Sequence, residues 1–189
     1  MALTATIHSF DIELSDADRG VYETLALRVA RHPSETEESL VTRVLAYCLE
    51  YTEGLGFSRG LAEPDEPALA VRDLTGAIAV WIDVGAPDAA RMHRASKAAP
   101  RVVVYTHKDP RAVSRQWAGE RIHRGAALEL YHVDHALLAA MVARLQRRMV
   151  FALSVSGGQL YLTIGGELLE GAVARHPVAT GEDTSGRPS

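Results

Sequence analysis

Three carboxylates in the first half of the chain are the residues best suited to chemistry. Asp83 ends the apolar run at residues 79–82, and Asp65 and Glu66 lie in an acidic, proline-containing loop one short hairpin earlier. Two or three converging carboxylates with open positions bind a hard divalent cation such as Mg2+. Such an ion polarises a phosphodiester and lowers the pKa of an attacking water. We therefore predict a Mg2+ site that uses Asp83 together with Asp65 or Glu66.

Three cations follow these carboxylates on the next predicted helix. Arg91, Arg94 and Lys97 are spaced three residues apart, so they share one helix face. A cation beside the attacking water stabilises hydroxide and the charge that develops on phosphate. Arginine clamps phosphate well but stays protonated, so Lys97 is chemically the better general base. All three are candidate catalytic residues.

An α/β arrangement has to position these side chains. Asp83 lies at the carboxyl end of an expected strand, which is where open α/β sheets bind their ligands. Strands alternate with helices over residues 77–147, and this alternation predicts a sheet that is at least partly parallel. The expected elements are strands 77–84, 101–107 and 128–133 and helices 87–99, 110–123 and 134–147.

Antiparallel hairpins are predicted on both sides of this segment. Residues 3–13 and 21–31 alternate apolar and polar side chains, and residues 149–166 form a second hairpin that turns on Gly157-Gly158. Between them, Ser34 and Glu37 form a capping box for a helix that reaches about residue 52. The tail from residue 175 lacks apolar content and is expected to be disordered, which leaves one domain over residues 1–174.

Composition restricts the class of protein. A chain of 189 residues with 47% hydrophobic and 23% charged residues is typical of one soluble globular domain. Cys48 is the only cysteine, which excludes an intramolecular disulfide and a thiolate zinc cluster. The N-terminus does not resemble a signal peptide, and no apolar stretch approaches the roughly 20 residues that span a membrane. We expect a cytoplasmic protein without membrane contact.

Charge is distributed unevenly along the chain. The net charge is -4, yet residues 91–124 contain nine Lys or Arg and only two acids. A basic block of this kind beside acidic segments suggests a site where cations meet carboxylates or the phosphates of nucleic acid. A solvated basic helix face is the structural alternative. P-loop and dinucleotide-binding fingerprints do not occur in the sequence.

Several segments together resemble a known family. MALTATI, HPSETEE, FSRGL, DEP, WIDVGAPD and VVVY, in this order and at these spacings, resemble the YaeQ family from Met1 to about residue 165. The family is largely uncharacterised, and its members resemble a variant of the PD-(D/E)XK, or restriction-endonuclease-like, nuclease fold. The resemblance implies an α/β fold with a mixed sheet flanked by helices, to which the N-terminal and C-terminal hairpins are additions.

The superfamily motif carries over only in part. Asp83 matches its (D/E) position, and Asp65 or Glu66 is the best match to its first aspartate. Glu37, or Glu35 on the same helix turn, matches a metal-binding acid that some nucleases contribute from their first helix. The catalytic lysine belongs at residue 85, where this chain has glycine. For the chain to be an enzyme, Lys97, Arg91 or Arg94 has to replace that lysine.

Two functions therefore stay open. The first is a Mg2+-dependent nuclease-like protein that cleaves or binds nucleic acid, which the acidic cluster favours. The second is a catalytically inactive descendant that binds nucleic acid or a protein partner, which Gly85 favours. A hydrolase of small phosphorylated metabolites is a third class that the sequence does not exclude.

The candidate residues also have structural explanations. These are a turn before Pro87 for Asp83, the capping box for Glu37, loop solvation for Asp65 and Glu66, orientation of the helix start for His32, and the core for Trp81.

Overall fold

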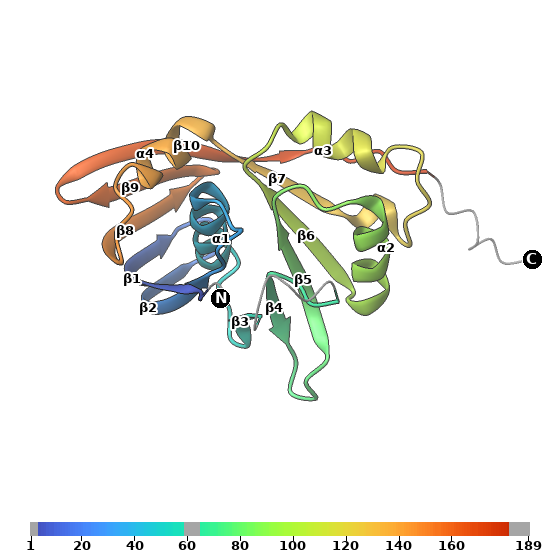
Figure 1. The fold of residues 1–189 in the computed structure, drawn as a ribbon, viewed down its shortest axis with the longest axis horizontal. Helices are drawn as coiled ribbons and strands as arrows, with labels where there is room; N and C mark the ends of the chain where they lie inside the picture. The colour runs from blue at the N-terminus through green and yellow to red at the C-terminus, as the bar shows by residue number, and fades with distance from the viewer. Residues whose placement is uncertain (1–3, 59–64, 182–189) are drawn as a thin grey trace, which may run out of the picture. The chain divides into compact units, whose positions relative to one another are not determined.

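Most of the predicted strands and helices are present in the structure, a computed structural model that describes residues 4–58 and 65–181. The helices are α1 (Glu37–Leu49), α2 (Ala89–Ala98), α3 (Pro110–Trp117) and α4 (His135–Val142). The strands, labelled in Figure 1, are β1 (Thr6–Asp16), β2 (Val21–Arg31), β3 (Leu55–Phe57), β4 (Leu69–Arg72), β5 (Ile78–Val84), β6 (Arg101–Thr106), β7 (Glu129–Val133), β8 (Arg148–Ser156), β9 (Gln159–Ile164) and β10 (Glu167–His176). The prediction of a mixed α/β structure is confirmed, and most strand pairs are antiparallel.

Contacts divide the chain into two compact units. Unit 1 consists of Met1–Tyr51 and Val133–Ala174, and unit 2 consists of Thr52–His132 and Arg175–Ser189. The sequence predicts one domain over residues 1–174, whereas the chain leaves unit 1 after Tyr51 and returns to it at Val133. The first crossing lies just before the segment rich in glycine, proline and acids at residues 54–68, and the second lies where the predicted strand 128–133 meets the predicted helix 134–147.

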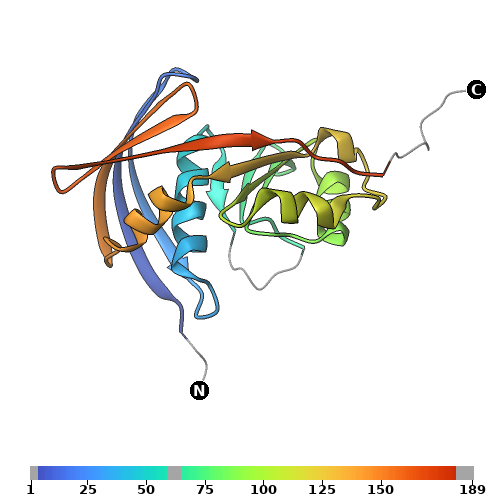
Figure 2. The ribbon, with the colours of Figure 1, turned by 90° about the horizontal axis from the view of Figure 1, so that it is seen from above.

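The unit 1 sheet has the strand order β2-β1-β8-β9-β10. Strands β1 and β2 form the predicted N-terminal hairpin, and β8 and β9 form the predicted hairpin at Gly157-Gly158. The parallel pairing of β1 with β8 joins these two hairpins. Every second residue of β1 from His8 to Asp16, including Phe10 and Ile12, is buried. Helices α1 and α4 contact each other and lie on one face of this sheet (Figure 2).

The unit 2 sheet has the order β7-β6-β5-β4-β3. Strands β5, β6 and β7 are parallel, as the alternation of strands and helices predicts, and β3 and β4 extend the sheet antiparallel. The two sheet faces carry different side chains because neighbouring residues of a strand point to opposite faces. Trp81 and Asp83 of β5 therefore point to the same face.

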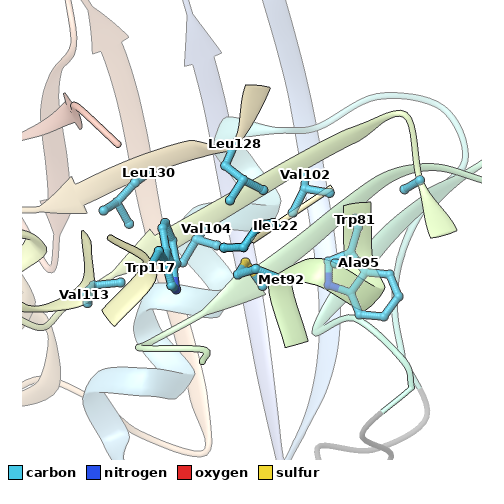
Figure 3. Close-up of a cluster of buried hydrophobic side chains, with 11 residues drawn as sticks. Trp81, Met92, Ala95, Val102, Val104, Val113, Trp117, Ile122, Leu128 and Leu130 are labelled. Atoms are coloured by element: carbon cyan, nitrogen blue, oxygen red, sulfur yellow. The ribbon is translucent and has the colours of Figure 1, made fainter. Parts of the chain in front are cut away.

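Helices α2 and α3 cover that face of the unit 2 sheet. Met92 of α2 and Trp117 of α3 are fully buried against side chains of the parallel strands, as Figure 3 shows. The strand side chains of this cluster are Trp81, Val102, Val104 and Leu130. Because both helices bury one side here, their opposite sides face solvent.

The C-terminal part of the chain differs from the prediction. The sequence predicts a hairpin that ends near residue 166, and the structure adds a third strand, β10. Residues 175–181, assigned to a disordered tail by composition, continue β10 to His176 and then hydrogen-bond within unit 2. The N–H of Gly181 donates to the carbonyl of Glu120 at 3.1 Å, and Val178 packs on the core cluster. Residues 182–189 of the predicted tail lie outside the described residues.

Helices α3 and α4 are shorter than predicted. Helix α3 ends at Trp117, two residues before Gly119, whose φ of 78° is a left-handed value that ends a helix easily. Helix α4 ends at Val142. Among the described residues, no helix has the length and apolar character needed to cross a membrane.

Candidate functional site

The candidate site is built where β5 turns into α2. Asp83 precedes the last residue of β5 and is only 3% exposed. Gly85 then turns the chain with φ at 96°, and its N–H donates to the carbonyl of Tyr105 at 2.9 Å. Asp88 caps α2 by accepting a hydrogen bond from the N–H of Arg91 at 2.7 Å. Glycine suits this turn, because any side chain at residue 85 is strained at this φ.

The Asp83 carboxylate accepts four hydrogen bonds. Oδ1 accepts from the N–H of Ala68 at 3.2 Å and from Nη2 of Arg91 at 2.8 Å. Oδ2 accepts from Nε1 of Trp81 at 2.9 Å and from Nε of Arg91 at 2.7 Å. Asp83 thus joins its own strand, the segment that precedes β4, and helix α2.

Arg91 is the cation that reaches Asp83. Its two hydrogen bonds to the carboxylate form a bidentate pair, which is the strongest and most directional ion-pair geometry. Nη2 also donates to the main-chain carbonyl of Glu66 at 2.8 Å, and the guanidinium lies 5.5 Å from the centre of the Trp81 ring. The hydrogen bonds to Asp83 raise the pKa of Arg91, against the effect of burial. Arg91 therefore stays charged and cannot act as a base.

The other predicted site residues of unit 2 lie at the surface. Asp65 is exposed and forms an ion pair of 3.7 Å with Arg94, which is also exposed. Lys97 is exposed one turn further along α2. Glu66 is half-buried and lines a different feature, a cavity of about 350 Å³ whose wall includes Arg72. Of the three predicted cations, only Arg91 is recorded in contact with Asp83.

The two acids predicted from the first helix belong to unit 1. Glu37 lies in the first turn of α1 and pairs with Arg31 at 3.4 Å. Glu35 is buried and forms a bidentate pair with Arg43, with hydrogen bonds of 3.1 Å and 2.9 Å. Both acids therefore have arginine partners.

The geometry at Asp83 does not fit Mg2+. A carboxylate offers about four lone-pair positions, and the four donors around Asp83 use them all. A hard cation needs such oxygen lone pairs directed at it, so it has to displace Arg91 before it can bind. Within residues 4–58 and 65–181, no group of three or more His, Cys, Asp or Glu side chains is arranged to hold a metal ion.

Sequence comparison identifies the family. The YaeQ protein family profile matches residues 1–173. The chain belongs to the YaeQ family. The uncharacterised YaeQ proteins of Escherichia coli K12 and Shigella flexneri are each 33% identical to it over 165 residues, which is 86% of this chain and 91% of each relative.

Solved structures of the YaeQ family have the same fold. The crystal structure of the YaeQ protein from Pseudomonas syringae matches with a TM-score of 0.82 and 31% identity, over 90% of this chain and 95% of that protein. The YaeQ protein from Xanthomonas axonopodis pv. citri matches with a TM-score of 0.79 and 30% identity, over 93% and 99% of the two chains. The predicted membership of the YaeQ family is confirmed, and these names assign no activity.

Two ion pairs, one buried and one partly exposed, were not anticipated from the sequence. Arg43 lies within the apolar face of α1, eight residues after Glu35, and a lone charge on such a face is the signal that it has a buried partner. Arg101 of β6 binds Glu129 of β7 through two hydrogen bonds of 2.9 Å, which lower the pKa of Glu129. The second pair joins adjacent parallel strands, so only the sheet order reveals it.

Proposed function

We propose that this chain binds nucleic acid without cleaving it, through the exposed cations of α2 and α3. The observation that carries the proposal is the saturation of Asp83 by Arg91, Trp81 and the N–H of Ala68. A nuclease of the PD-(D/E)XK type needs this carboxylate free for a metal ion and a lysine at residue 85. Here the carboxylate neutralises an arginine, and a left-handed glycine occupies residue 85.

The nuclease resemblance supports this proposal at the level of ancestry. In a restriction-endonuclease-like arrangement, β5 and its acid correspond to the catalytic strand, and α2 follows it with a phosphate-facing cation. An inactive descendant keeps the acid because the acid has acquired a structural partner. Asp83 has such a partner in Arg91, and their pair connects β5, α2 and the residues before β4.

The solvent side of α2 and α3 supplies the binding surface. Lys97 of α2 and Arg111 and Arg115 of α3 are exposed and form no ion pair among the described residues. They lie opposite the buried side that Met92 and Trp117 mark. Exposed, unpaired cations on one helical layer are the electrostatic footprint of a phosphate-binding surface. We call Lys97, Arg111 and Arg115 the basic layer.

Salt-dependent binding tests this surface. Fluorescence anisotropy with labelled duplex DNA, single-stranded DNA and single-stranded RNA is measured between about 50 and 200 mM salt. Affinity is expected to fall steeply with salt, because each neutralised phosphate releases condensed counterions. Lys97→Glu and Arg115→Glu are each expected to weaken binding about tenfold and to reduce the logarithmic salt slope by about one.

Arg147→Glu is the matched control, since Arg147 is exposed, lies in unit 1 and forms no ion pair among the described residues. It changes the net charge by the same amount as either test variant. If it weakens binding as much as they do, the effect is one of net charge and the basic layer is not the site. Absence of binding to all three probes at low salt contradicts the proposal and favours a protein partner.

A further inference from the structure

Strand β2 is the outer strand of the unit 1 sheet. Among the strands that the structure describes, it pairs only with β1, and the register of this pair is continuous from Val21 to Arg31 (Figure 1). Its other side presents the main-chain N–H and C=O groups of alternate residues, of which the carbonyl of Ala30 accepts a hydrogen bond from Nη2 of Arg43 at 2.8 Å. Such an edge is a template on which another strand can form hydrogen bonds.

The edge lacks most of the features that normally prevent strand pairing. Natural edge strands are usually short, bulged, or interrupted by proline or lysine. Strand β2 has eleven residues, VYETLALRVAR, with no proline, glycine or lysine and no break in its register. Tyr22, 66% exposed, is a large side chain left in solvent at its start. An uninterrupted edge of this length is unusual in a chain that stays monomeric.

We propose that β2 pairs antiparallel with β2 of a second copy of this chain, with the two-fold axis at Ala26. In this register Ala26 faces its own counterpart and the eleven residues of the two strands stand opposite one another, and the carbonyl of Ala30 has to share or exchange the hydrogen bond that it accepts from Nη2 of Arg43. Cyclic two-fold dimers are the commonest oligomers, and their interfaces require one surface to complement itself. The side chains of β2 meet that requirement on both faces of the sheet.

On the face that the helices cover, Leu25 stands opposite Leu27 of the second copy. Both leucines are already buried, so the pairing extends an apolar row across the axis. Near the ends of the same face, exposed Glu23 is a diagonal neighbour of Arg31 of the second copy. Diagonal neighbours are about 7–8 Å apart, which these long side chains can span.

On the opposite face of the sheet, which the helices leave open, the small residue Ala26 lies at the two-fold axis. The long side chains of Tyr22 and Arg28 lie away from the axis. Arg28 stands opposite Thr24 of the second copy and diagonal to its Tyr22, a position from which a guanidinium can contact an aromatic ring. The two copies of Arg28 are four residues out of register, so they do not repel each other at short range. A register shifted by two residues loses at least two of the eleven pairs.

Disulfide trapping tests the register. Cys48 is buried and its pKa is raised to about 12, so it does not compete as a thiol. Ala26→Cys places two exposed cysteines opposite each other, at a Cα separation that a disulfide can bridge. We expect a covalent dimer under mild oxidation. Thr24→Cys is the control on the same face and strand, because its two copies lie roughly 13 Å apart along the strands and cannot be joined.

Sedimentation velocity of the full chain tests the dimer itself. At micromolar concentration we expect a species of twice the 20.5 kDa chain mass. Ala26→Lys opposes two ammonium groups at the axis and should give monomers. Thr163→Lys, on the same open face but in the inner strand β9, should stay dimeric. A monomeric wild-type chain, a dimer that resists Ala26→Lys, or equal trapping of both cysteine variants would overturn the proposal.

Discussion

At the scale of single residues, the function proposed for the chain depends on whether the Asp83 carboxylate is hydrogen-bonded or free to bind a metal ion. A buried carboxylate with free lone pairs at the end of a parallel strand is a candidate metal ligand, whereas one that is fully hydrogen-bonded stabilises the fold. Asp83→Asn removes the bidentate ion pair and takes the carboxylate charge away from Arg91. We expect the variant to lose about 1.5–3 kcal/mol of unfolding free energy in urea, which is the typical contribution of a hydrogen bond to a charged group.

Asp88→Asn is the control for this change, since asparagine caps a helix as well as aspartate does. It should leave stability nearly unchanged. If Asp83→Asn is as stable as the wild type, or more stable, the carboxylate is not the framework residue proposed here. Relief of repulsion between neighbouring acids would then be the better explanation.

Gly85 provides a second prediction at the residue scale. Introducing the lysine that the nuclease motif requires places a Cβ at φ 96°, and a non-glycine residue in such a conformation costs about 1–3 kcal/mol. We expect Gly85→Lys to be destabilised by this amount in thermal or urea unfolding. Ala86→Lys, at the exposed neighbouring position, should be nearly neutral. Equal stability of the two variants would show that the turn tolerates a side chain.

At the scale of elements, helix α1 begins differently from the sequence prediction. Ser34 was expected to cap it, but the Ser34 hydroxyl lies 2.6 Å from Nδ1 of His32, and Thr36 accepts the hydrogen bond from the N–H of Ser39 instead. Both residues are good caps, so propensity alone does not choose between them. Thr36→Ala should cost about 1 kcal/mol of unfolding free energy and Ser34→Ala much less. The reverse order would restore the predicted capping box.

Elements with strong periodicity were predictable, and those held by main-chain contacts were not. The apolar pattern of α1, the alternation in β1 and β2 and the β-branched run of β6 each appear where expected. Strand β10 and residues 175–181 form main-chain hydrogen bonds, such as that of Gly181, which amino-acid composition does not reveal. At the site, Asp83 and Arg91 were both named, but their bidentate contact depends on the turn at Gly85.

At the scale of the whole molecule, the two proposed binding surfaces belong to different units of the chain. The basic layer belongs to unit 2, while the open edge of β2 belongs to unit 1. Because the net charge is -4, attraction to phosphate has to come from the local basic block rather than from the chain as a whole. Binding is therefore expected to be more sensitive to the position of a charge reversal than to the number of charges changed.

Metal-dependent cleavage is the measurement that tests the central claim most directly. Purified wild-type chain and Asp83→Asn are incubated with labelled duplex and single-stranded DNA and RNA, in Mg2+ and separately in Mn2+. With the four lone-pair positions of Asp83 already occupied, we predict no cleavage by either chain above a protein-free blank. Cleavage by the wild type that requires the metal and disappears in Asp83→Asn would contradict the account, because Asp83 would then be a metal ligand in a working nuclease.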